Sequence, residues 1–89
     1  MAKRKNLKKT INGICGVLFT DVLICAYNHP ELPTQTIDEL LAQILNLQNE
    51  FIARINHTEK GSVKKFYIKL RNEFETAINQ LIDKINELN

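Results

Sequence analysis

Residues 8–30 read KKTINGICGVLFTDVLICAYNHP, in which two lysines are followed by a nearly continuous apolar run from Ile11 to Tyr27. The run comes directly after the basic leader MAKRKNL, so the chain opens with the charge and the apolarity of a secretion signal. A membrane anchor and the central helix of a soluble bundle have the same two properties. The fold depends on which of the three this stretch is.

Three features of the run favour a soluble core helix. Asp21 lies in its middle, where a carboxylate costs roughly 2.5–3.5 kcal/mol on membrane insertion. The run ends in CAYNHP, without the small-x-small pattern of a signal cleavage site. It is also shorter than the ~20 apolar residues of a membrane span. We therefore expect a cytoplasmic protein with no integral membrane span; the alternative is a chain exported or membrane-tethered through residues 1–27.

The prolines and the last glycine divide the chain into three segments, and helices are predicted at about 5–28, 36–59 and 62–88. Thr36 and Glu39 form a T-x-x-E capping box for the second helix. Gly61 and Ser62 supply its end and the start of the third. In the second and third segments the apolar residues recur in steps of three and four, so each set shares one helix face. These residues are Ile37, Leu40, Leu41, Ile44, Leu47, Phe51, Ile52, Ile55, Val63, Phe66, Tyr67, Leu70, Phe74, Ala77, Ile78, Leu81, Ile82, Ile85 and Leu88.

Short connections between successive helices predict antiparallel neighbours. The expected fold is therefore all-α, a single three-helix domain over residues 1–89 with up-down-up topology. A helix–loop–helix pair that dimerises is the alternative. Since 89 residues bury only a modest core, the bundle could also dimerise into a larger one.

The first helix has more apolar surface than two neighbours can cover. Its expected inner stripe is Ile11, Ile14, Cys15, Leu18, Val22, Cys25 and Ala26. The surplus predicts a homodimer interface at Gly13, Gly16, Val17, Phe19, Leu23 and Ile24. The two glycines leave backbone bare for the approach of another helix or of a ring such as Phe66 or Phe74. Asp21 lies either on the exposed outer strip or at the dimer contact.

The topology sorts the charges between the two ends of the bundle. Eleven of the twelve basic residues fall in one half: Lys3, Arg4, Lys5, Lys8, Lys9, Arg54, Lys60, Lys64, Lys65, Lys69 and Arg71. Several of these lysines lie at helix N-termini, where the helix dipole also attracts anions. The candidate anion-binding residues are Lys5, Lys8, Lys9, Lys60, Lys64 and Lys65, and nucleic acid is one possible ligand.

No catalytic or metal-binding constellation can be recognised. His29 and His57 are in different regions, without the clustered ligands of a metal site. Cys15 and Cys25 are too far apart along one helix, roughly 15 Å, to form a disulfide. The aromatic residues, Tyr27 and Tyr67 among them, are expected in the core with their hydroxyls at its rim. We therefore expect no enzyme activity, no cofactor and no metal.

The segments KRKNLKKTINGICGVLF and ILNLQNEFIARINHTEKGSVKKFY resemble those of a family of small, uncharacterised all-helical bacterial proteins. The resemblance covers most of the chain and implies a helical bundle and a bacterial origin. It carries no activity or functional residue. The expected function is thus self-association or binding of another protein, with nucleic-acid or other anion binding at the N-termini of the first and third helices as the alternative.

Overall fold

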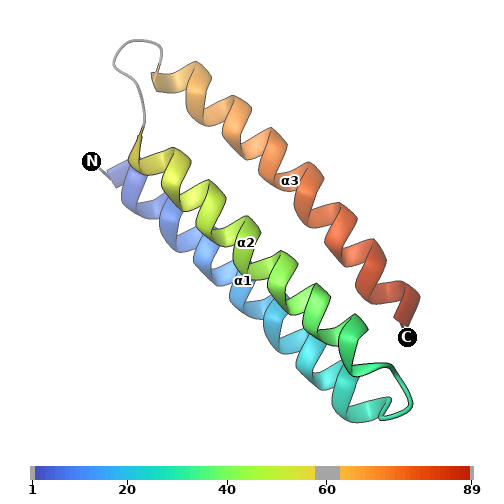
Figure 1. Ribbon diagram of the computed structural model, residues 1–89. Coiled ribbons are helices and arrows are strands. Elements are labelled where there is room, and N and C mark those ends of the chain that lie inside the picture. The colour runs from blue at the N-terminus through green and yellow to red at the C-terminus, as the bar shows by residue number, and fades with distance from the viewer. Residues whose placement is uncertain (1, 58–62, 89) are drawn as a thin grey trace.

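The computed structural model describes residues 2–57 and 63–88, which form three α-helices. Helix α1 spans Ala2–Asn28, α2 spans Thr34–Asn56 and α3 spans Val63–Leu88. The helices run up, down and up, and the molecule is elongated, with extents of 51 × 18 × 16 Å (Figure 1). The all-α, three-helix prediction is confirmed, and no strand occurs in the described ranges.

The start of α2 differs from the prediction. The helix begins at Thr34, with Pro33 at the N-cap position and no side-chain cap. The Pro33 carbonyl accepts hydrogen bonds from the backbone N–H groups of Thr36 and Ile37, at 3.1 and 3.4 Å. Pro33 itself is extended, with φ −61° and ψ 133°, and the helical turn starts with the residue after it. The prediction of a capping box formed by Thr36 and Glu39 is therefore wrong.

The end of α2 is also earlier than predicted. The helix stops at Asn56, and the backbone N–H of His57 donates to the carbonyl oxygen of Ala53 at 3.1 Å. Gly61 and Ser62, the predicted end and start signals, lie outside the described residues.

Buried apolar side chains from all three helices form one core. They include Ile11, Cys15, Leu18 and Val22 from α1, Ile37, Leu40, Ile44, Phe51 and Ile55 from α2, and Leu70, Phe74, Ile78, Leu81 and Ile85 from α3. Each of these residues belongs to a predicted inner face. Ile14, which was predicted on the inner stripe of α1, is instead exposed. The rings of Phe51 and Phe74 meet edge to face at 5.2 Å between centroids, which joins α2 to α3.

The three helices do not pack equally closely. The backbones of α1 and α2 lie side by side along their length, whereas α3 stands further from both (Figure 1). Polar contacts cross between neighbours on the surface. The Gln48 side-chain amide donates to the Asn12 side-chain oxygen at 2.7 Å, joining α2 to α1. Arg54 pairs with Glu73, joining α2 to α3.

The Arg54–Glu73 pair gives a prediction on pH. The hydrogen bond from Arg54, and then the charges of Arg54 and Lys69, hold the pKa of Glu73 below its ordinary value. A lowered pKa means that the pair stabilises the fold above the ordinary carboxyl pKa, and that this stabilisation is lost as the pH falls through the folded value. In a carbon-13 titration, the pKa of Glu73 should rise in Arg54→Gln and rise less in Lys69→Gln. An unchanged titration in Arg54→Gln would contradict the pairing.

Candidate functional site

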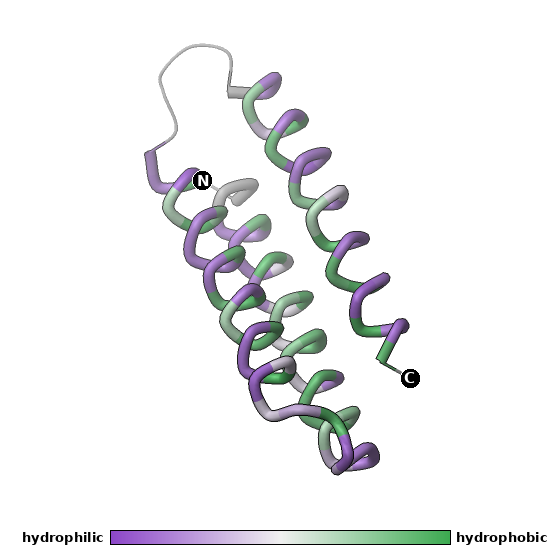
Figure 2. The backbone as a smooth tube through the Cα atoms, turned by 45° about the vertical axis from the view of Figure 1, so that its right-hand side comes forward, coloured by the Kyte–Doolittle hydropathy of each residue, from purple (hydrophilic) through white to green (hydrophobic). Residues whose placement is uncertain are grey.

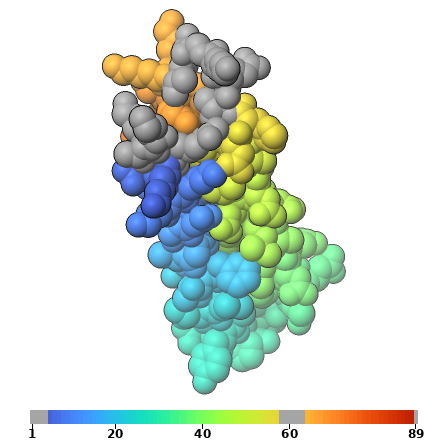
Figure 3. Space-filling view, turned by 90° about the vertical axis from the view of Figure 1, so that its left-hand side faces the viewer, coloured from blue at the N-terminus to red at the C-terminus, as the bar shows by residue number. Residues whose placement is uncertain are grey.

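The outer face of α1 is apolar and uncovered. Val17 is 61% exposed, Ile24 is 53% exposed and Tyr27 is 87% exposed, and Leu23 is exposed beside them. Figure 2 shows apolar colour along much of α1, whereas α3 alternates between hydrophilic and apolar at each turn. In the space-filling view α1 is uncovered along its described length beside α2 (Figure 3). Because one side of the helix is in the core and the other is apolar too, α1 has an apolar face without a partner in the described chain.

The structure brings most of the predicted interface residues to this face. Gly13, Gly16, Val17, Leu23 and Ile24 are all exposed. Phe19 differs, since it is half-buried and packs against the core. Tyr27 was expected in the core and is instead the most exposed large apolar residue among those described, because it lies on the outer side of the last turn of α1.

Gly13 and Gly16 face open space. No described atom lies within 4 Å of the position that a Cβ would take at either residue. Phe66 and Phe74 therefore do not pack on the glycines: Phe74 is buried in the core, and Phe66 packs against that core from α3. The bare strip of backbone is available to a second molecule.

Two polar residues of α1 lie on or beside this face. The Thr20 hydroxyl donates to the Gly16 carbonyl oxygen at 3.0 Å, so it is satisfied within the helix. Asp21 is exposed in the single chain, which agrees with its expected place on the outer strip and leaves its place at a dimer contact a prediction. Its carboxylate lies beside the apolar face and meets water.

The predicted basic end is formed by the N-terminal turns of α1 and α3 and the C-terminal turns of α2 (Figure 1). Lys5, Lys9, Lys64 and Lys65 are exposed there, and Lys8 is half-buried. Lys60 lies outside the described residues. Lys64 and Lys65 are successive residues of α3, so their side chains leave the helix in different directions.

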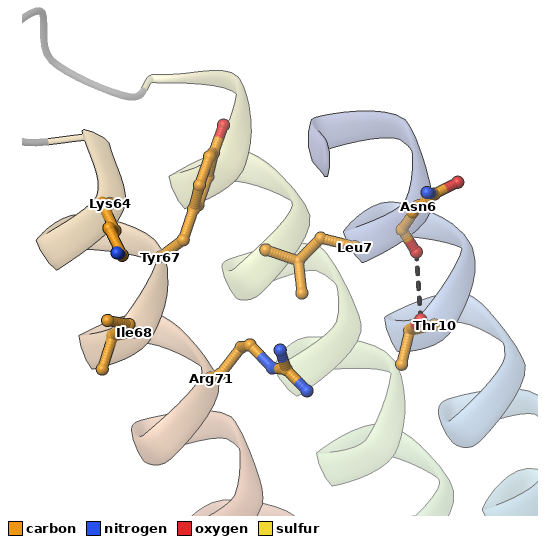
Figure 4. Close-up of a pocket in the computed structure, with 7 residues that line it drawn as sticks. All are labelled: Asn6, Leu7, Thr10, Lys64, Tyr67, Ile68 and Arg71. Atoms are coloured by element: carbon orange, nitrogen blue, oxygen red, sulfur yellow. Dashed lines mark hydrogen bonds between the residues drawn. The ribbon is translucent and has the colours of Figure 1, made fainter. Parts of the chain in front are cut away.

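A groove between α1 and α3 opens at this same end. It has a volume of about 580 Å³. Its lining residues are Asn6, Leu7, Thr10, Lys64, Tyr67, Ile68 and Arg71 (Figure 4). Of these, only Lys64 was among the predicted site residues. The i, i+3, i+4, i+7 spacing of the α3 residues signals a shared face, but finding the groove also requires the separation of α3 from α1.

The titratable groups offer no catalytic arrangement within the described ranges. Burial raises the pKa of the Cys15 thiol, and both cysteines are unbridged and buried. A backbone hydrogen bond, and then the side chain of His29, lower the pKa of Glu31; its carboxylate lies 3.1 Å from His29 Nδ1. Across residues 2–57 and 63–88, no group of three or more His, Cys, Asp or Glu side chains is placed to hold a metal ion.

The length of α1 bears on the membrane alternative. Residues 5–28 form a helix that is long and apolar enough to cross a membrane, by length and composition. Only 28% of its most apolar 18-residue segment is buried. The expectation that the run is too short for a span is therefore not supported. Core helices of soluble proteins and signal sequences meet the same criteria.

Comparison of the chain with protein-family models, with curated proteins and with solved structures gave no match in any of the three. The resemblance to small bacterial helical proteins, and the bacterial origin it implies, stay predictions.

Proposed function

We propose that this protein acts by binding a second copy of itself through the outer face of α1, as a non-enzymatic association module. The observation that carries the proposal is the exposure of Val17 and Ile24 on a helix whose opposite side is in the core. Burying such side chains stabilises an association by about 25 cal/mol per Å² of apolar surface. Because a chain of 89 residues buries only a modest core, the apolar surface buried in a dimer would add a large share to its stability.

The spacing of the exposed residues fits a partner helix. Gly13, Val17, Thr20, Ile24 and Tyr27 follow one another in steps of four, three, four and three. This is the heptad spacing at which two helices pack side by side along a shared seam. The Thr20 hydroxyl, already bonded to the Gly16 carbonyl, adds no unsatisfied donor to the seam. We name these five residues the α1 seam.

The sizes of the seam residues favour an antiparallel pair. If Val17 of one copy lies opposite Thr20 of the other, Gly13 lies opposite Ile24, so the smallest residue of the seam meets a large one and two residues of similar size meet each other. A parallel pair would instead place Gly13 on Gly13 and Ile24 on Ile24. The first would leave a void and the second would separate the helices.

The charges favour the same orientation. The end of the bundle at the start of α1 carries Lys5, Lys9 and Lys64, and the other end carries Glu31, Asp38 and Glu39. An antiparallel pair places the basic end of each copy beside the acidic end of the other. A parallel pair places like charges together, which opposes association. Asp21 lies at the edge of the seam, where its carboxylate keeps its water.

Sedimentation equilibrium at micromolar concentration tests the proposal. We expect a mass of twice the chain's 10.3 kDa, and weaker association at high salt because the end-to-end attractions are screened. A monomer of 10.3 kDa that partitions into phosphatidylcholine vesicles would overturn the proposal and assign the face to a membrane. A monomer without vesicle binding would also overturn it.

Replacing the two glycines with alanine is expected to change stability and association in opposite directions. Gly13→Ala and Gly16→Ala should each stabilise the isolated helix by about 1 kcal/mol, because nothing lies near the added methyl group. Only Gly13 belongs to the α1 seam, so Gly13→Ala should weaken association more than Gly16→Ala. Urea unfolding of dilute protein measures the first effect and sedimentation the second. Equal association of the two variants would contradict the seam.

A further inference from the structure

The groove between α1 and α3 combines apolar and cationic surface. On α3, Lys64, Tyr67, Ile68 and Arg71 lie on one face, about 10 Å from first to last along the helix. Ile68 is 53% exposed there and Tyr67 is half-buried. On α1, Leu7 projects between the two helices (Figure 4). The groove therefore has an apolar middle between two cations.

The charge of the lining has one sign. Lys64 and Arg71 line the groove, and no carboxylate does among the described residues. Within the described part of the chain neither residue forms an ion pair. In Figure 4 the guanidinium of Arg71 extends from α3 toward α1 and across the groove. The N-terminal turn of α3 adds a positive dipole potential at the Lys64 end of the groove. The groove thus favours an anion at the position that Arg71 reaches.

The neutral polar residues sit on the α1 side. The Thr10 hydroxyl donates to the Asn6 backbone carbonyl at 3.0 Å, so it is already satisfied. The side-chain amide of Asn6 lies at the rim of the groove (Figure 4). An apolar body in the middle of the groove would leave no unmet donor at Thr10, because that hydroxyl is already bonded within the helix.

We propose that this groove binds a single-chain amphiphile with an anionic head, of the fatty-acid type. The carboxylate would pair with Arg71, whose planar guanidinium can hold both carboxylate oxygens. The apolar chain would lie over Leu7 and Ile68 and beside the ring of Tyr67. A volume of about 580 Å³ is within the range of small-molecule pockets, roughly 300–1,000 Å³. The groove shares no residue with the α1 seam, but the two meet at Thr10, which lines the groove and lies opposite Tyr27 of the second copy in the antiparallel pair.

Titration calorimetry with decanoate, below the concentration at which it forms micelles, tests the site. We expect saturable binding of decanoate, and neither acetate nor decyltrimethylammonium should bind, since one lacks the chain and the other has the wrong charge. Arg71→Gln should weaken decanoate binding by about tenfold or more, the loss of one charge-assisted pair. Lys65→Gln removes the same charge from a residue outside the groove and should leave binding unchanged.

A second pair of variants tests the apolar contact. Ile68→Asn should weaken decanoate binding, whereas Ile82→Asn, a partly exposed residue of α3 outside the groove, should not. The inference is overturned if decanoate does not bind, if decyltrimethylammonium binds equally, or if Lys65→Gln weakens binding as much as Arg71→Gln. It is also overturned if a short oligonucleotide binds, loses binding in Arg71→Gln and is not displaced by decanoate. Sedimentation of the same samples measures dimer formation, so a failure of decanoate binding can be told apart from a failure of association.

Discussion

Leu70→Ala is expected to lower the free energy of unfolding by about 2–5 kcal/mol, because it removes a fully buried side chain and leaves a cavity. Leu70 is 0% exposed and contributes to the core from α3. A protein of this size has a total stability of only roughly 5–13 kcal/mol. The substitution should therefore remove a large part of the stability and unfold a substantial fraction of the chain at moderate temperature.

The packing around Leu70 leaves little room for the structure to relax into the cavity that Leu70→Ala creates. α3 stands further from α1 and α2 than they stand from each other, so it is anchored mainly by its buried side chains. Phe74, one turn further along, is the other large anchor near this end and meets Phe51. The backbone cannot close a cavity between helices that are already apart.

Urea unfolding followed by circular dichroism measures the effect. Leu45→Ala is the matched control, because it makes the same chemical change on α2 at a side chain that is 46% exposed. It should change stability by less than about 0.5 kcal/mol. If Leu70→Ala proved as stable as Leu45→Ala, the described packing of α3 against the core would be wrong.

The core could be predicted from the sequence because α2 and α3 are strongly amphipathic. Apolar residues at steps of three and four leave only one face that can be buried, and Ile44, Ile55 and Leu70 are indeed fully buried. Helix ends were less predictable. The sequence predicts a side-chain cap at Thr36 for the start of α2, whereas the helix begins two residues earlier at Thr34, after Pro33 at the N-cap position and without a side-chain cap.

The surroundings of α1 could be predicted only in part. The predicted inner stripe of α1 does meet the core, with the exception of Ile14. Tyr27 lies off that stripe; the expectation that it is in the core rested on its aromatic ring alone. The surplus of apolar surface on α1 was predicted correctly, since it follows from comparing its apolar side chains with the two helices available to cover them. The groove was missed because its width depends on the distance between α1 and α3, which no local pattern encodes.

Val17→Glu and Thr20→Lys should each dissociate the proposed dimer, while an equimolar mixture of the two variants should associate. In the antiparallel pair Val17 lies opposite Thr20, so each single variant buries two unpaired charges in its own homodimer. We expect association weaker by roughly a hundredfold or more, about 3 kcal/mol. Both positions are exposed in the single chain, so neither substitution should unfold it.

The mixture separates the two orientations. In a mixed antiparallel dimer, the introduced glutamate meets the introduced lysine at one level, and the unmodified Val17 and Thr20 meet at the other. In a mixed parallel dimer, the introduced glutamate meets Val17 of the other copy and the introduced lysine meets Thr20, so both charges stay unpaired. Sedimentation of each variant alone and of the mixture therefore distinguishes the arrangements. Two monomeric variants that give a dimer only when mixed would establish antiparallel pairing, and a mixture that stays monomeric would exclude it.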